Sequence, residues 1–281
     1  MAKQFLRWVG SKRQLTGPIV SALGADDRGI YREPFLGSGA VFFALKPSEA
    51  VLSDVNADLI AAYVALREFP ELLIQALQTH AVMHNADPDY WYKGVRSQPG
   101  IQGAQDDWLA SDILTKGARM IYLNKAGFNG LWRVNLKGEM NCPIGNDGNG
   151  SRLISFDVDN LRECSKALQC ATIVNCDYST ALKGAGHPDR VYCDPPYVPI
   201  VTQKTNFNAY SKSFTTEDQL ELIRLLSKAS DNGATAILSN ASTTESAGMY
   251  KDKQTVELTV KRIVAAKAED RKIVRELLVT F

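Results

Sequence analysis

The residues best suited to chemistry are Asp194, Pro195, Pro196 and Tyr197, which follow the apolar run 191–193. This run predicts a short buried strand, and ligands of α/β proteins bind where such strands end. Proline has no N–H, so its carbonyl stays free to accept a hydrogen bond, while the tyrosine ring offers a stacking face. Acceptors beside a flat ring suit an exocyclic amino group on a heteroaromatic ring. On its own, the tetrapeptide fits a proline-stiffened turn equally well.

A glycine-rich turn at 33–39 is a second candidate. Residues 30–32 predict a strand and residues 40–45 an apolar helix, with Gly37 and Gly39 between them. Such a turn lets the backbone approach a ligand closely at a helix N-terminus.

Asp54 follows the next predicted strand, 50–53. An acidic residue at this distance from a glycine-rich turn can bind ribose hydroxyls. Phe42 stands where a dinucleotide-binding fingerprint has its third glycine, so the pattern favours an adenosine ligand without a pyrophosphate over a nicotinamide dinucleotide. A nicotinamide-dependent dehydrogenase is thereby the weaker alternative.

The basic segment 3–15 carries Lys12 directly after the turn residues Gly10 and Ser11. Its ammonium could lie near a carboxylate or a phosphate. Taken alone, the segment is more typical of a solvated basic helix start.

In the rest of the chain, the hydrophobic pattern predicts alternating strands and helices before and after a purely helical stretch. Helical spacing covers 58–81 and 106–123, and a capping box opens a helix at 216–231. The other predicted strands are 172–176, which leads into Asp177, then 235–238, 255–264 and 272–281, the last two paired antiparallel.

Residues 124–145 predict a hairpin that turns at 137–138. Its Asn, Arg and Lys side chains are of the types that bind base edges and phosphates, although a polar surface hairpin is the more usual interpretation of such a stretch. Residues 145–151 are a flexible linker by composition, and 198–214 predict a mobile loop near the site.

Composition bounds the function class. The 281 residues are 45% hydrophobic and 22% charged with a net charge of +1, so overall charge does not indicate a nucleic-acid partner. Five cysteines without a CxxC pair favour free thiols in a reducing compartment and predict no metal site. Without a long apolar run or a signal-peptide pattern, the protein is expected in the cytoplasm.

Taken together and in this order, the motifs resemble the DNA adenine-N6 methyltransferase family of the Dam type (D12 class). The resemblance covers nearly the whole chain and rests on these segments: Phe5-Leu6-Arg7-Trp8-x-Gly10-x-Lys12, Glu33-Pro34-Phe35-x-Gly37-x-Gly39-x-Val41-Phe42, Asp54-x-Asn56-x-Asp58-Leu59-Ile60, Gly127-Phe128-Asn129-Gly130-Leu131-x-Arg133-x-Asn135, Tyr192-Cys193-Asp194-Pro195-Pro196-Tyr197, Asn206-Phe207-x-x-Tyr210, Leu238-Ser239-Asn240 and Arg271-Lys272-x-Val274-x-Glu276-Leu277-Leu278.

The resemblance implies an α/β fold: a Rossmann-like, seven-stranded S-adenosylmethionine-dependent methyltransferase sheet built from 1–60 and 154–281. A helical and β-hairpin target-recognition domain, 61–153, would be inserted between them. The implied activity is methylation of adenine N6, with the base flipped out of duplex DNA, and in the closest relatives the site is GATC. The resemblance also implies a bacterial cytoplasm, with a phage as a second source, and a monomer without an obligate protein partner.

The resemblance assigns roles residue by residue. The catalytic residues would be Asp194, Pro195, Pro196 and Tyr197. The residues implied to contact S-adenosylmethionine are Trp8, Lys12, Phe35, Gly37, Gly39, Asp54, Asp177, Tyr178 and Asp194. Those implied to contact DNA are Arg7, Asn129, Leu131, Arg133, Asn135, Asn206 and Tyr210.

Two departures from the family pattern bear on which DNA sequence is recognised more than on the reaction. Arg7 stands where the best-known relative has lysine, and Trp132 where relatives often have a smaller residue. Two alternatives stay open: methylation of amino groups in RNA or of side-chain amides in protein, and a catalytically inert DNA-binding module that retains the fold.

Overall fold

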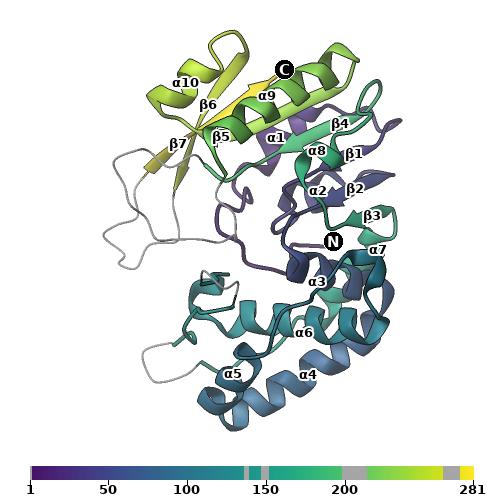
Figure 1. The fold of residues 1–281 in the computed structure, drawn as a ribbon, viewed down its shortest axis with the longest axis vertical. Helices are drawn as coiled ribbons and strands as arrows, with labels where there is room; N and C mark the ends of the chain where they lie inside the picture. The colour runs from purple at the N-terminus through teal and green to yellow at the C-terminus, as the bar shows by residue number, and fades with distance from the viewer. Residues whose placement is uncertain (1, 136–138, 147–151, 198–213, 262–272) are drawn as a thin grey trace.

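A computed structural model of the protein describes residues 2–135, 139–146, 152–197, 214–261 and 273–281. A seven-stranded sheet, in the order β3-β2-β1-β4-β5-β7-β6, forms the upper half of Figure 1. Its strands are β1 (Tyr31–Glu33), β2 (Ala50–Ser53), β3 (Ala171–Val174), β4 (Arg190–Cys193), β5 (Thr235–Ala241), β6 (Gln254–Lys261) and β7 (Ile273–Thr280). The first five are parallel, and β7 runs antiparallel to both neighbours. The mixed α/β sheet and its seven predicted strands are confirmed.

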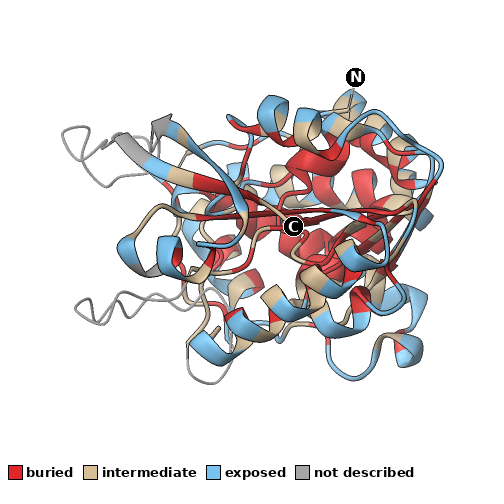
Figure 2. Cartoon of the chain, turned by 90° about the horizontal axis from the view of Figure 1, so that it is seen from above, coloured by how far each residue is buried: buried red, intermediate tan, exposed pale blue. Residues whose placement is uncertain are grey.

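Helices cover both faces of the sheet because successive side chains of a strand point to opposite faces, and the central strands carry apolar side chains on both. Val191 and Cys193 pack in one cluster with Leu222 of α9 (Thr216–Asp231), whereas Tyr192 belongs to the other cluster, with Ile19 of α1 (Thr16–Leu23). Figure 2 shows the sheet as a buried layer between half-exposed helices. The other helices near the sheet are α2 (Ala40–Leu45), α7 (Val158–Leu168), α8 (Tyr178–Ala181) and α10 (Thr244–Met249).

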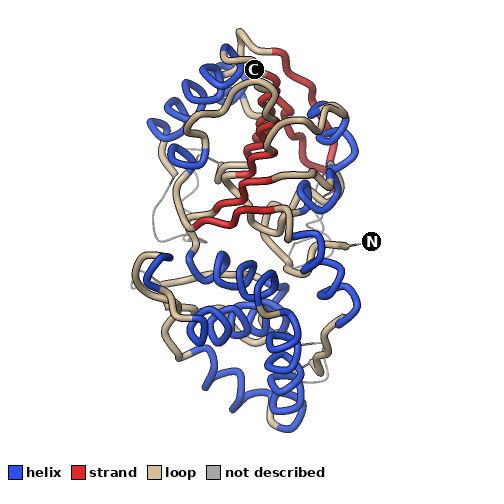
Figure 3. The backbone as a smooth tube through the Cα atoms, turned by 90° about the vertical axis from the view of Figure 1, so that its right-hand side faces the viewer, coloured by secondary structure: helices blue, strands red, loops and turns tan. Residues whose placement is uncertain are grey.

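The lower half of the molecule is helical, as the blue tube of Figure 3 shows. It contains α3 (Ala57–Glu68), α4 (Pro70–Ala86), α5 (Pro88–Arg96), η1 (Gln105–Asp107) and α6 (Ala110–Ala126). The periodicity at 58–81 suggested one helix, but the chain divides at Phe69, where Pro70 occupies the first turn of α4. Proline lacks the N–H that a continuous helix would need and is well tolerated at a first helical position. The domain boundaries at 61 and 153 stay a prediction.

The predicted hairpin follows α6 and the short η2 (Phe128–Gly130). Its two arms meet at two isolated antiparallel bridges, Gly127 with Ile144 and Val134 with Met140, while the predicted turn at 137–138 lies outside the described residues. Trp132 is only 4% exposed, and the Arg119 guanidinium lies 6.0 Å from its ring. The tryptophan therefore anchors the hairpin to the helices and does not contribute to its outer surface.

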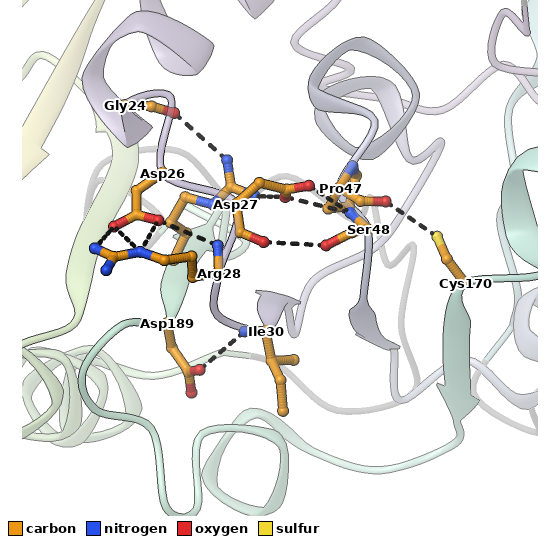
Figure 4. A network of polar contacts seen from close by, with 10 residues as sticks. Gly24, Asp26, Asp27, Arg28, Ile30, Pro47, Ser48, Cys170 and Asp189 are labelled. Carbon is orange, nitrogen blue, oxygen red and sulfur yellow. Dashed lines mark hydrogen bonds and ion pairs between the residues drawn. The ribbon is translucent and has the colours of Figure 1, made fainter.

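Polar contacts fasten the loops that precede the parallel strands (Figure 4). The Asp27 carboxylate accepts hydrogen bonds from the Ser48 N–H, at 3.0 and 3.2 Å, and from Arg190 at the start of β4. Asp189 accepts from the N–H of Ile30, just before β1. The amino ends of β1, β2 and β4 are thus held together, which fixes the relative positions of their carboxyl ends on the opposite edge.

Among the helices of the described segments, none is long and apolar enough to cross a bilayer.

Candidate active site

The chemical groups gather at the carboxyl edge of the parallel strands, where ligands of α/β sheets bind. Glu33 ends β1, Asp54 follows β2, Asp194 follows β4, and Asn240 lies near the end of β5. Because these strands are parallel neighbours, segments more than a hundred residues apart in the chain deliver their polar side chains to one place.

Asp194 is held by Lys12. Both carboxylate oxygens lie 2.7 Å from the ammonium, which also donates to the Gly10 carbonyl at 2.9 Å. The lysine side chain is 4% exposed and that of Asp194 20% exposed. The sequence suggested that Lys12 approaches a carboxylate or a phosphate, and the carboxylate is that of Asp194.

Burial raises the pKa of Asp194 to about 6, against the lowering effect of the Lys12 ammonium, while Glu276 adds a smaller raising effect. The carboxyl group is therefore mostly ionised at pH 7 and becomes protonated a little below that pH. A group with such a pKa can accept a hydrogen bond at neutral pH and loses one acceptor in mild acid.

A second carboxylate, Glu276 of β7, completes this cluster. Its Oε1 accepts a 2.9 Å hydrogen bond from the Tyr197 hydroxyl, and its Oε2 lies 3.6 Å from the Lys12 ammonium. The Lys12 nitrogen lies 5.4 Å from the centre of the Tyr197 ring. Glu276 lies within one of the segments that resemble the family, but the sequence predicts no role for it. Its proximity to Lys12 and Tyr197 depends on the antiparallel register of β7, which the sequence does not reveal.

Glu33 is a further carboxyl group that the sequence did not single out. It is buried and accepts hydrogen bonds from the Tyr31 hydroxyl, at 2.8 Å, and from the Phe42 N–H, at 3.1 Å. Burial raises its pKa to about 8. At neutral pH it is thus mostly uncharged, and it ties the end of β1 to the first turn of α2.

The glycine-rich turn is built around Gly37, which has a φ of 47°. Its N–H donates to Asp54 at 3.2 Å, and its carbonyl accepts from the Tyr63 hydroxyl at 3.1 Å. A Cβ at this position would come within 2.8 Å of the Trp8 ring. Asp54 is 2% exposed, and burial raises its pKa to about 6. In this arrangement the predicted cofactor residues Trp8, Gly37 and Asp54 are direct neighbours.

Two of the predicted cofactor residues, Phe35 and Tyr178, pack together with a third ring, Phe214. Phe35 stacks on Tyr178 at 5.6 Å, and Phe214 meets both rings edge-on at 5.9 Å. Asp177 caps α8 by accepting from the N–H groups of Ser179 and Thr180. β3 ends at Val174, two residues before the predicted end of this strand. Tyr178 is the first residue of α8.

The N-terminal segment and the base of the hairpin are joined through Asn124. Its side chain accepts from the Arg7 N–H at 2.9 Å and donates to the carbonyls of Arg7, at 2.7 Å, and Gly130, at 2.9 Å. Burial followed by the nearby Arg152 charge lowers the pKa of Arg7, and burial, Arg7 and Arg152 lower that of Lys125. These three cations therefore lie close enough to affect one another, and the Asp157 carboxylate acts on Lys125 in the opposite direction. The asparagine was missed because one buried amide in a helix carries no distinctive pattern.

Of the predicted DNA-contacting residues, Asn129 lies in η2, and Leu131, Arg133 and Asn135 all lie on the first arm of the hairpin. Arg133 donates to the side chain of Asn141 at 2.7 Å and to its carbonyl at 3.1 Å, and Asn135 donates to Glu139 at 2.8 Å. Asn129 is exposed with a φ of 54°, and Leu131 is half-buried. Two further residues that were predicted to contact DNA, at 206 and 210, lie outside the described residues.

Gly37→Ala is expected to weaken binding of the cofactor that the sequence predicts, S-adenosylmethionine, by about tenfold or more, because a left-handed backbone costs an L-residue roughly 1–2 kcal/mol. The new methyl group would also push the Trp8 ring out of place. Isothermal titration calorimetry measures the change. Gly17→Ala is the matched control, since no atom lies within 4 Å of its added Cβ, and equal affinities for the two variants would contradict the expectation.

Comparisons with known proteins identify the family. Residues 8–265 match the family model of the D12 class N6 adenine-specific DNA methyltransferases. The chain is 32% identical over 279 residues to the type II methyltransferase M1.LlaDCHI of Lactococcus lactis subsp. cremoris, covering 99% of this chain and 95% of that protein. It is also 32% identical over 285 residues to a DNA adenine methylase of Vibrio cholerae (100% and 97% covered) and 29% identical over 280 residues to that of Escherichia coli K12 (99% and 95% covered). The chain therefore belongs to the D12 class N6 adenine-specific DNA methyltransferase family and is an adenine-specific DNA methyltransferase.

Proposed function

We propose that this enzyme transfers the methyl group of S-adenosylmethionine to N6 of an adenine flipped out of duplex DNA, within the sequence GATC. The observation that supports this most is the cluster of Asp194, Lys12, Tyr197 and Glu276 at the carboxyl edge of the sheet. It combines carboxylate acceptors with a ring, and Arg7, Lys125 and Arg152 lie near one another at the base of the hairpin.

The chain's own residues fit S-adenosylmethionine. The turn at Gly37 leaves no room for a side chain beside Trp8, so backbone and ring can face a ligand directly. Asp54 and Asp194 supply carboxylates that suit a ligand with hydroxyl groups and a positive charge. We assign the ligand to the predicted residues Trp8, Lys12, Phe35, Gly37, Gly39, Asp54, Asp177, Tyr178 and Asp194.

The reaction needs little from the protein beyond positioning. When bound, S-adenosylmethionine supplies a sulfonium methyl group whose carbon–sulfur bond breaks, leaving its electron pair on sulfur, as the N6 lone pair forms the new bond. Asp194 and the Pro195 carbonyl each accept a hydrogen bond from one of the two N6–H groups, which favours a pyramidal nitrogen with a free lone pair. Tyr197 stacks on the ring, worth about 1–3 kcal/mol, and in-line positioning provides most of the rate. The surplus N6 proton passes to solvent, so Asp194 acts chiefly as an orienting acceptor.

Base flipping is required because N6 of a paired adenine cannot reach a site at the sheet edge. Flipping costs a few kcal/mol, which stacking on Tyr197 helps to offset. A duplex with 2-aminopurine at the target position measures this step: its fluorescence should rise when the protein binds. An unchanged signal at saturating protein would contradict flipping.

We assign DNA reading to Arg7, Asn129, Leu131, Arg133 and Asn135. An arginine can donate two hydrogen bonds to guanine in the major groove, and such a pair contributes about 1–3 kcal/mol of discrimination. Arg133 is pre-oriented for such a contact because Asn141 holds its guanidinium from one side.

Arg133→Ala is expected to lower the preference for GATC over a one-base variant by about 5- to 150-fold, which corresponds to that free energy. Steady-state kcat/KM on the two duplexes measures the ratio. Arg224→Ala is the matched control, because Arg224 is an exposed helix residue paired with Glu221 on α9. Equal discrimination by the two variants would remove Arg133 from the reading surface.

The substrate class is tested by the modified product. Duplex DNA, a matched RNA and a protein mixture are incubated with methyl-labelled donor, and the labelled product is identified. N6-methyladenine in DNA is the expected result. Label in RNA or protein instead would show that the enzyme methylates that class of substrate and not DNA. Donor binding without any labelled product would indicate an inert DNA-binding module. Double-stranded DNA is then the partner, and we expect a monomeric, cytoplasmic enzyme.

A further inference from the structure

Glu276 occupies an unusual position for a carboxylate. It belongs to β7, an antiparallel strand, and pairs in register with Ala241, the last residue of β5. The register therefore brings an early residue of β7 level with the carboxyl edge of the parallel strands. Its side chain is 13% exposed and points into the cluster around Lys12.

The two oxygens of Glu276 face different partners. Oε1 accepts the Tyr197 hydroxyl at 2.9 Å, which fixes the far end of the ring that follows the two prolines. Oε2 is buried and accepts no hydrogen bond from a described residue, but it lies 3.6 Å from the Lys12 ammonium. One carboxylate thus contacts both the stacking ring and the counter-ion of Asp194.

The charges around Asp194 come from several elements. Lys12 and Glu276 face it, and the more deeply buried Glu33, Tyr192 and Cys193 also lie within electrostatic range. Two carboxylates consequently share one ammonium, and Glu33 is mostly protonated at neutral pH. The cluster keeps a net negative charge, so Lys12 does not neutralise Asp194 fully.

We propose that Glu276 is a positioning residue for methyl transfer: it anchors the Tyr197 ring and shares Lys12 with Asp194, which leaves the Asp194 carboxylate less neutralised and therefore a stronger acceptor while it is ionised. The inference rests on the proposed function. The inference goes beyond the proposed function because it assigns a role to a residue of β7, outside the Asp-Pro-Pro-Tyr segment. Glu276 touches Tyr197 and Lys12 and acts through them.

Two substitutions separate the two effects. Glu276→Gln keeps an oxygen for the Tyr197 hydroxyl but removes the charge. Glu276→Ala removes both, and its single-turnover rate should fall by about 10- to 100-fold, the effect of losing a hydrogen bond to a charged group. Tyr197→Phe removes the same hydrogen bond, so the double variant Glu276→Ala/Tyr197→Phe should be less impaired than the product of the single effects.

The pH profile is the readout that a purely structural role would not change. The Glu276 charge raises the pKa of Asp194, so Glu276→Gln should lower that pKa and move the acid limb of the single-turnover rate to lower pH. Glu257→Gln is the matched control. Glu257 lies on the adjacent strand β6, where it accepts from Ser242 and pairs with Arg275 at 3.3 Å.

Wild-type protein is assayed first on duplex DNA with labelled donor, which tests the proposed function by itself. Given wild-type transfer, a shifted acid limb in Glu276→Gln but not in Glu257→Gln supports the proposal, with folding of each variant checked by thermal denaturation. An acid limb in Glu276→Gln that coincides with the wild-type curve would overturn the sharing of Lys12. Fully multiplicative effects of Glu276→Ala and Tyr197→Phe would overturn the anchoring of the ring.

Discussion

Asp194→Ala is expected to lower methyl transfer by at least about 10²–10³-fold, the scale seen when one preorganised charge-stabilising group is removed from a site. The substitution deletes an acceptor for N6 but leaves the Gly37 turn and the aromatic trio in place. S-adenosylmethionine binding should therefore stay measurable by calorimetry. Lys12 retains Glu276 as a counter-ion, so the site does not hold an unpaired buried cation.

Two comparisons make this expectation specific. Asp194→Asn keeps the shape of the side chain and should be nearly as inactive, because its amide presents donors to Lys12 and offers fewer acceptors. Asp252→Ala replaces an exposed aspartate near the start of β6 and should behave as wild type. Normal turnover by Asp194→Ala would refute the mechanism.

Lys12→Met should produce an enzyme that is slow at pH 7 and recovers in alkaline solution. Lys12 is the main group that lowers the pKa of Asp194 against its burial. Without the ammonium, that pKa rises from about 6, and a larger fraction of the acceptor is protonated at neutral pH. Every unit by which it exceeds 7 costs about tenfold in the ionised fraction at pH 7.

The sign follows from which form is active. The ionised carboxylate accepts from N6, so activity is present above the pKa of Asp194 and is lost as the pH falls through it. Lys12→Met should therefore move the acid limb of kcat to higher pH, opposite to the shift expected for Glu276→Gln. Lys251→Met, an exposed lysine before β6, is the control. A rate in Lys12→Met that stays low at every pH would contradict this effect on Asp194 and would mean that Lys12 contributes mainly through its assigned contact with the donor.

The carboxyl-edge cluster could be predicted in part because strand order constrains it. Asp54 and Asp194 each follow an apolar run, and parallel strands bring such residues to the same edge. The turn before Lys12 also allowed its approach to a carboxylate or a phosphate, although a solvated basic helix start was the more usual interpretation of that segment. The seven strands were visible as apolar runs with breaks between them.

The remaining contacts depend on three-dimensional register. Glu276 reaches Lys12 only because β7 runs antiparallel to β5 with one particular pairing, and periodicity does not specify pairing. Glu33 was passed over as the start of a glycine-rich turn, although its burial and its bond to Phe42 organise that turn. Asn124 bonds to Arg7, which lies 117 residues away in the chain, a relation that no local pattern contains.

The central claim is tested most directly by methyl transfer to two short duplexes that are identical except for GATC in one and a scrambled site in the other. Labelled S-adenosylmethionine supplies the methyl group, and label in each duplex is counted after a single turnover. Label on the GATC duplex alone, recovered as N6-methyladenine, is the predicted result. Equal label on both would contradict the inferred recognition by Arg7 and Arg133, and no label on either, with donor binding intact, would contradict the proposed function itself.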